Sequence, residues 1–195
     1  GLGKTIDVAR QLRAGGCEAP IVLFGYFNPL FVRGEQRSID DAADAGIDAL
    51  LVVDLPQSEG AELRARAADR GIAIVPLLTP TSSDARVEEV RGLAAAGSIG
   101  FVYYVSVTGV TGSGDAPLLE ASRAAARLKE KHGAPTVIGF GIDTPDKART
   151  AASLVDGAVV GTAIVREIEE GKTPEERIAR VTKLVKALRQ GLDST

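Results

Sequence analysis

Residues able to bind a ligand follow the apolar runs of this 195-residue chain. Gly141 follows one run, Gly161 and Thr162 follow the next, and Gly112 lies in a glycine-rich loop after an earlier run. Glycine lets backbone amides approach an anion closely, and a threonine hydroxyl adds a donor. These four positions predict a phosphate site. The alternative is that the glycines only make room at crowded strand ends.

Polar side chains also follow two runs nearer the N-terminus. Tyr26 and Asn28 follow the first and can orient a substrate through hydrogen bonds, whereas Asp54 ends the second. A carboxylate at such a place either works in a site or caps local amides, and the residue alone does not decide between them.

The runs themselves predict parallel strands. Each is rich in β-branched or aliphatic residues, and each follows an Ala-rich amphipathic helix and a glycine suited to a left-handed helix end. The expected strands are residues 20–26, 49–54, 72–78, 100–105, 136–141 and 158–161, and the glycines are Gly16, Gly46, Gly71, Gly97, Gly133 and Gly157. Strands alternating with helices indicate a parallel α/β fold, either an open doubly wound sheet or a (β/α)8 barrel.

The spacing of the strands favours the barrel. They recur at roughly 22–35 residues, which suits a TIM (β/α)8 barrel, but a barrel needs eight strands. We therefore expect one barrel domain over residues 1–195 that is N-terminally incomplete, with only strands three to eight and their helices present.

The helix ends are also marked in the sequence. Helices are expected over residues 116–132 and 174–190. Side-chain caps are expected at Ser58, at Ser83, at Thr144 before Pro145, and as a capping box of Thr173 with Glu176. His132 ends a charged helix, where the helix dipole favours the protonated ring, and it is not expected to be a ligand.

The composition excludes several classes of function. A net charge of −3 and an aromatic content of 4% argue against a nucleic-acid partner. No apolar run is long enough to span a membrane. The chain has one cysteine and one histidine, too few for a zinc site, so no metal is expected. A single cysteine forms no internal disulfide, which predicts a cytoplasmic location.

Taken together, these segments resemble the α subunits of tryptophan synthase. The segments that carry the resemblance are Tyr26-Phe27-Asn28-Pro29, residues 51–56, residues 104–112, Gly139-Phe140-Gly141-Ile142 and residues 161–165. The resemblance implies a lyase of tryptophan biosynthesis that cleaves indole-3-glycerol phosphate to indole and glyceraldehyde 3-phosphate by a retro-aldol reaction. It also implies a β subunit in an α2β2 heterotetramer. Pyridoxal phosphate belongs to that partner, and no cofactor is expected in this subunit.

The resemblance also assigns roles to residues. It implies that the phosphate binds at Gly112, Gly141, Gly161 and Thr162, and that Asn28, Asp54 and Thr111 lie near the lid and the partner face. The indole pocket is implied at Phe24, Tyr26, Leu51, Phe101, Tyr103 and Phe140. The family's acid and base, a Glu after strand two and an Asp in the next loop, correspond to positions before Gly1. No catalytic residue is therefore expected within residues 1–195.

Two other functions stay open. Since the expected carboxylates are not in the chain, the second possibility is a barrel fragment that binds a ligand or a partner without turnover. The third possibility is another phosphate-binding barrel enzyme.

Overall fold

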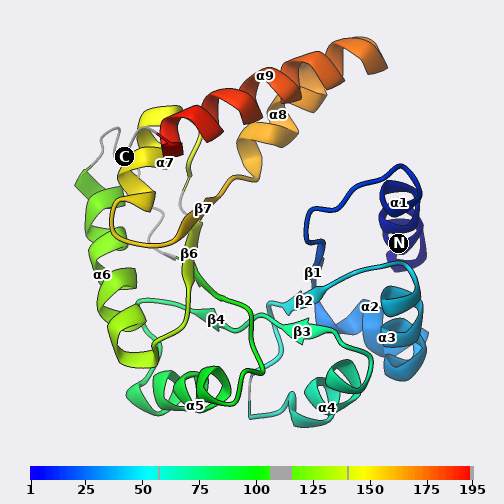
Figure 1. The fold of residues 1–195 in the computed structure, drawn as a ribbon, viewed down its shortest axis with the longest axis vertical. Coiled ribbons are helices and arrows are strands. Elements are labelled where there is room, and N and C mark those ends of the chain that lie inside the picture. Colours follow the sequence, from blue (N-terminus) through cyan, green and yellow to red (C-terminus); the bar gives the residue numbers. More distant parts are fainter. Residues whose placement is uncertain (57, 106–115, 140, 194–195) are drawn as a thin grey trace. The chain divides into compact units, whose positions relative to one another are not determined.

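Short strands alternate with helices along the chain (Figure 1). The computed structural model describes residues 1–56, 58–105, 116–139 and 141–193. Its contacts divide the chain into two compact units: Gly1–Leu77 with Glu88–Gly100, and Leu78–Val87 with Phe101–Thr195. The single, N-terminally incomplete barrel domain stays a prediction, and each unit is described by itself.

The first unit is built on a three-stranded sheet in the order β1-β2-β3. Its strands are β1 (Val22–Gly25), β2 (Ala49–Val52) and β3 (Ala73–Ile74), and its helices are α1 (Leu2–Ala14), α2 (Phe27–Arg33), α3 (Glu35–Asp44) and α4 (Ala61–Asp69). Both strand pairs are parallel. Apolar residues from these strands and helices form one buried cluster that includes Ile6, Ile39, Leu50, Leu63 and Ile74.

One arginine joins the end of α1 to the starts of β1 and β2. Arg13 donates from Nε to the Gly46 carbonyl at 2.9 Å and from Nη2 to Asp48 Oδ2 at 2.6 Å. Its Nη1 donates to the carbonyls of Cys17 and Ala19, at 2.6 and 2.8 Å. Asp48 Oδ2 also accepts from the backbone amide of Ile21 at 2.6 Å. This network holds the end of α1 against the strand starts, and no local pattern in the sequence predicts it.

The second unit contains a sheet in the order β4-β5-β6-β7. Its strands are β4 (Leu77–Leu78), β5 (Val102–Val105), β6 (Thr136–Gly139) and β7 (Gly157–Val159). Its helices are α6 (Ala116–His132), α7 (Pro145–Ala152), α8 (Thr162–Glu170) and α9 (Pro174–Asp193), whereas α5 (Asp84–Ala95), which follows β4, is divided between the two units after Val87. The pairs β5–β6 and β6–β7 are parallel. The predicted parallel α/β class is confirmed.

The single strand expected over residues 72–78 is wrong. The run forms two short strands, with β3 in one sheet and β4 in the other. Pro76 lies between them, and a proline has no amide hydrogen to donate to a sheet.

The helix ends test the predicted caps. Ser83 Oγ accepts from Arg86 N and Thr144 Oγ1 accepts from Lys147 N, so both caps are confirmed. The Ser58 cap is wrong, because α4 begins after Gly60 with no side-chain cap. Thr173 caps α9 as predicted, but Glu176 accepts from the amide of Lys172 rather than from that of Thr173. Five of the six predicted glycines have a positive φ, whereas Gly157 begins β7.

His132 corrects another expectation. It ends α6 as predicted, but it is only 2% exposed. Burial, with a smaller contribution from Lys129, lowers the pKa of its ring. Its Nδ1 accepts from the Ala134 amide at 3.2 Å. The neutral ring, rather than the protonated one, therefore suits this place.

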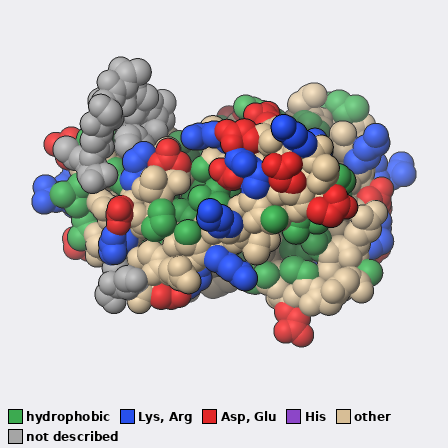
Figure 2. All heavy atoms as spheres, turned by 90° about the horizontal axis from the view of Figure 1, so that it is seen from above, with side chains coloured by type: hydrophobic (Ala, Val, Ile, Leu, Met, Phe, Trp, Pro, Cys, Tyr) green, Lys and Arg blue, Asp and Glu red, His purple; other side chains and the backbone are tan. Residues whose placement is uncertain are grey.

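Charges of both signs are interspersed on the face drawn in Figure 2. Within the described part of the chain, no group of three or more His, Cys, Asp or Glu side chains could hold a metal ion. None of the helices, as far as they are described, is long and apolar enough to cross a membrane.

Candidate functional site

A cavity of about 250 Å³ lies in the first unit, where β1 and β2 end. Its lining is contributed by β1, β2, the start of α1 and α2, and comprises Gly1, Leu2, Thr5, Leu23, Phe24, Gly25, Tyr26, Pro29, Leu30, Leu50, Leu51 and Val52. The structure thus brings together three of the six residues expected in the indole pocket: Phe24, Tyr26 and Leu51.

The cavity is suited to an apolar, flat ligand. Leu51 is buried and forms part of its floor, whereas Phe24 and Tyr26 are 54% and 66% exposed. The lining contains no Asp, Glu, Lys, Arg or His; its polar side chains are the hydroxyls of Thr5 and Tyr26. Such a cavity binds by contact and by excluding water, with few groups to orient the ligand.

Asp54 lies beside this cavity and acts as a helix cap. Its Oδ1 accepts from the backbone amide of Phe27, the first residue of α2, at 2.7 Å. A carboxylate at a helix N-terminus is stabilised by the free amides and by the helix dipole. Of the two roles open for Asp54, the structure therefore shows the capping one. Asn28 follows in the first turn of α2 and is exposed.

The sequence prediction missed helix α2. We expected a strand over residues 20–26 and no helix directly after it, yet a helix starts at Phe27. Two signals were present. Pro29 lies in the first turn, where the missing amide hydrogen costs little, and Gly34 follows the last residue.

In the second unit, the glycines predicted to bind phosphate lie at one sheet edge. The β6–β7 register pairs Gly139 with Val159, and Gly141 and Gly161 each follow two residues later. Gly141 has a φ of +54°, which favours glycine, and is exposed. Both residues therefore follow the carboxyl ends of neighbouring parallel strands, where barrels bind phosphate.

The start of α8 offers free amides at the same edge. Gly161 is the N-cap, no side chain caps the helix, and Thr162 is its exposed first residue. The first amides of a helix lack intrahelical acceptors and attract anions. Gly112, Thr111 and Phe140 lie outside the described residues.

Tyr103 lies against a glycine of the next strand. Its side chain is 8% exposed, and burial raises the pKa of its hydroxyl. A Cβ atom added at Gly139 would lie only 2.1 Å from Tyr103 Oη. Gly139 thus makes room for the phenol ring, a role the sequence prediction missed. Phe101, another residue of the expected pocket, is half-buried just before β5.

Comparison with known proteins places these features in a family. The sequence model described as Tryptophan synthase alpha chain matches residues 1–193. The chain is similar to the tryptophan synthase alpha chain from Legionella pneumophila subsp. pneumophila, with 29% identity and a TM-score of 0.82, over 96% of this chain and 68% of that one.

Two further structures agree. Subunit alpha from Legionella pneumophila str. Paris is 28% identical, with a TM-score of 0.85 over 100% of this chain and 70% of that one. A chain from the tryptophan synthase α2β2 complex of Pyrococcus furiosus is 27% identical, with a TM-score of 0.79 over 95% of this chain and 71% of that one. The fold of this chain is therefore the α/β barrel type of these proteins.

Proposed function

Because this chain belongs to the tryptophan synthase alpha chain family, we propose that it is the lyase subunit that cleaves indole-3-glycerol phosphate to indole and glyceraldehyde 3-phosphate. The family match over residues 1–193 carries this proposal. The apolar cavity and the glycine edge support it, because the substrate has one flat apolar end and one anionic end.

The reaction is a retro-aldol cleavage. The bond between indole carbon 3 and the first glycerol carbon breaks, and carbon 3 gains a proton. The hydroxyl on that glycerol carbon loses its proton and becomes the aldehyde carbonyl, while the proton of the ring nitrogen leaves and returns. Positioned acid and base groups speed each transfer.

The binding residues are proposed from both units. The ring binds at the residues around the cavity, Phe24, Tyr26 and Leu51, and at Phe101, Tyr103 and Phe140. The phosphate binds at Gly112, Gly141, Gly161 and Thr162. Support comes from the shared cavity lining of the first three and from the common sheet edge of Gly141 and Gly161.

The acid and base are proposed to lie outside residues 1–195. In support, the cavity lining contains no carboxylate. Asn28, Asp54 and Thr111 are proposed to serve the lid and the partner face. The hydrogen bond from Phe27 N to Asp54 then acts indirectly, by fixing the helix that carries Asn28.

A β subunit in an α2β2 complex is the proposed partner, and pyridoxal phosphate is proposed to belong to that subunit alone. The α2β2 complex of the Pyrococcus furiosus relative supports this. So do two apolar side chains on α2, Phe31 and Val32, which are 63% and 75% exposed. A cytoplasmic location fits a biosynthetic enzyme of this family.

A second function, binding without turnover, is favoured by one observation. The cavity can hold a ring, but its lining offers neither an acid nor a base. In that case the chain binds indole or glycerol phosphates and the β subunit, and releases no product.

The test measures indole release from indole-3-glycerol phosphate by the 195-residue chain, with and without β subunit. Release supports the lyase proposal but overturns the placement of the acid and base outside the chain. Binding of the substrate without release agrees with the placement of the acid and base outside residues 1–195 and means that this chain by itself performs only the second function. If neither binding nor release occurs, both functions fail for it.

A charged variant tests the phosphate site in the same assay. Gly161→Asp adds a carboxylate where a Cβ would meet no atom within 4 Å, so the fold should tolerate it. We expect it to abolish the preference for the phosphorylated substrate over its dephosphorylated analogue, since like charges repel. Gly92→Asp is the control, because a Cβ there is equally unobstructed but lies in α5. An unchanged preference in Gly161→Asp would remove Gly161 from the phosphate site.

A further inference from the structure

Helix α2 is too short to be stable without contacts to the rest of the first unit. It has seven residues, and helices of that length are not stable alone in water. Its orientation therefore depends on contacts at its two ends. At the first end, the Asp54 carboxylate accepts the amide of Phe27 at 2.7 Å.

The second end joins α3 through one residue. Gly34 follows α2 and precedes α3, with a φ of +93° that favours glycine. The buried hydroxyl of Ser38 donates to the Leu30 carbonyl at 3.3 Å. That carbonyl is in the last turn of α2, where no amide of the helix can reach it.

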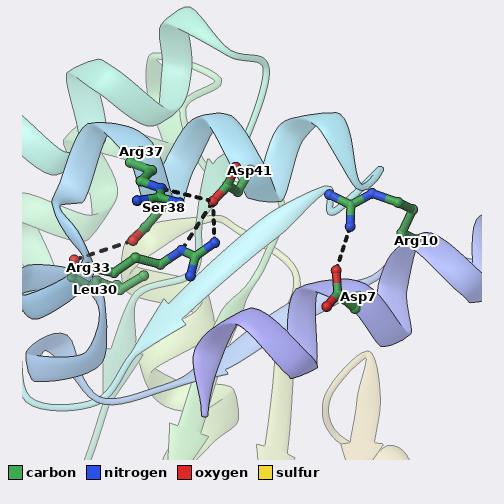
Figure 3. A network of polar contacts seen from close by, with 7 residues as sticks. All are labelled: Asp7, Arg10, Leu30, Arg33, Arg37, Ser38 and Asp41. Carbon is green, nitrogen blue, oxygen red and sulfur yellow. Dashed lines mark hydrogen bonds and ion pairs between the residues drawn. The ribbon is translucent and has the colours of Figure 1, made fainter.

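An ion pair crosses the same corner (Figure 3). Arg33, the last residue of α2, donates from Nε and Nη2 to Asp41 Oδ2 of α3, at 3.1 and 2.5 Å. Both side chains are about one-third exposed, and Arg37 Nε lies 3.8 Å from the same oxygen. The hydrogen bond from Arg33 is the main cause that lowers the pKa of the Asp41 carboxyl. The pair thus fixes the angle between α2 and α3.

Arg33 also lies against α1. A Cβ atom added at Gly3 would lie 3.1 Å from Arg33 Nη1, so the guanidinium passes close to the first turn of α1. Leu2 and Thr5 of that turn, and Pro29 and Leu30 of α2, line the same cavity. The guanidinium of Arg33, which α2 carries, therefore lies next to α1, the other helix that contributes to the cavity lining.

We propose that Arg33 and Asp41 are positioning residues that set the width of the cavity in the first unit, and so its affinity for the ring of the substrate. The inference deepens the proposed function and rests on it for the identity of the ring. Neither residue touches the ligand; both act through the placement of α1 and α2.

The test uses indole as the probe. The chain contains no tryptophan, so the fluorescence of added indole, excited at wavelengths that tyrosine does not absorb, reports its binding. We expect Asp41→Asn to raise the dissociation constant of indole by about threefold to tenfold, as for coupled neighbouring residues. The dissociation constant of indole-3-glycerol phosphate should rise in parallel.

The matched control breaks another ion pair on the same unit. Glu88→Gln removes the partner of Arg91 on α5, where both side chains are more than half exposed. It should leave the dissociation constant unchanged. Arg33→Lys keeps the charge but loses the two parallel donors, so its effect should be intermediate. Ser38→Ala provides a further variant, should Asp41→Asn fail to fold.

The outcomes separate this inference from the proposed function. Weaker indole binding in the variants supports the positioning role, whatever the indole-release assay shows of the lyase. A lower Tm with an unchanged dissociation constant of indole in the folded variants overturns the positioning role and leaves the lyase proposal as it was. Absence of indole binding to the wild type overturns the inference as well.

Discussion

The candidate sites of the two units consist of different groups: side chains in the first unit and backbone groups in the second. In the first unit, side chains form an apolar cavity, and a carboxylate and an ion pair hold the helix that lines it. In the second unit, glycines and the start of α8 form the edge, and the backbone is the proposed binding surface. Substitutions that remove side-chain atoms should therefore have the larger effects in the first unit, and substitutions that add them should have the larger effects in the second unit.

The largest loss of stability is expected at Gly139 in the second unit, where there is no room for a side chain. Gly139→Ala places a Cβ 2.1 Å from Tyr103 Oη and 2.8 Å from its Cζ, so the buried ring has to move. We expect the free energy of unfolding in urea to fall by about 1–3 kcal/mol, as for overpacked cores. Gly161→Ala is the matched control, because no atom lies within 4 Å and its φ is −116°. Equal stability of the two variants would contradict the crowding at Gly139.

In the first unit, the largest effect should follow the loss of a side chain. Arg13→Ala removes four hydrogen bonds, three of them to backbone carbonyls, and leaves Asp48 without its ion pair. Allowing for partial exposure, we expect a loss of about 1–2 kcal/mol in the free energy of unfolding.

Arg10→Ala serves as the control for Arg13→Ala. Its ion pair with Asp7 joins neighbouring turns of one helix, and both side chains are more than half exposed. Its loss should change stability by less than about 0.5 kcal/mol. A comparable loss in both variants would mean that the contacts of Arg13 with the strand starts add nothing.

The sequence predicted the features that depend on local physics. The helix over residues 116–132, the cap at Thr144 and the strand-end positions of Gly141 and Gly161 follow from propensity and turn chemistry, and each is found. It did not predict contacts between distant segments. Arg13 to Asp48 and Tyr103 to Gly139 each join residues more than thirty positions apart, and nothing next to them in the chain marks the pairing.

The errors have the same origin. The charge of His132 was inferred from its helix alone, and burial by the rest of the second unit reverses it. Pro76 was a visible sign of a break in the run over residues 72–78. Nothing in the sequence indicated that β3 and β4, on either side of it, belong to separate sheets.

Acid provides a way to separate the two units. Burial lowers the pKa of His132 below its ordinary value of about 6.5, so the unfolded chain takes up a proton first as the pH falls. The contribution of the neutral His132 ring to stability is complete above about pH 6.5 and is lost as the pH falls toward the pKa of His132 in the folded chain. In the first unit, Arg33 lowers the pKa of the Asp41 carboxyl, so that contribution is lost only at a more acidic pH, below about 4.

We therefore expect His132→Asn to flatten the pH dependence of stability between about pH 7 and 5. The Asn carbonyl can still accept the Ala134 amide hydrogen that His132 Nδ1 accepts. Urea denaturation at several pH values measures the slope, and hydrogen exchange shows which unit opens first. Asp41→Asn should leave that slope unchanged and act only in stronger acid. An equally steep slope in His132→Asn would exclude the histidine as its cause.

The smallest effect should come from the tyrosine next to Tyr103 in β5. Tyr104 is 1% exposed, and its hydroxyl has no hydrogen-bond partner among the residues that the structure describes. Burial raises the pKa of this hydroxyl, so the group stays neutral. The cost of removing it from water is not offset by a hydrogen bond to a described residue. Tyr104→Phe keeps the ring and removes that cost, so stability should stay equal or rise by about 0–1 kcal/mol. A clear loss in Tyr104→Phe would mean that the hydroxyl has a partner, and that the second unit, like the first, depends on a polar side chain.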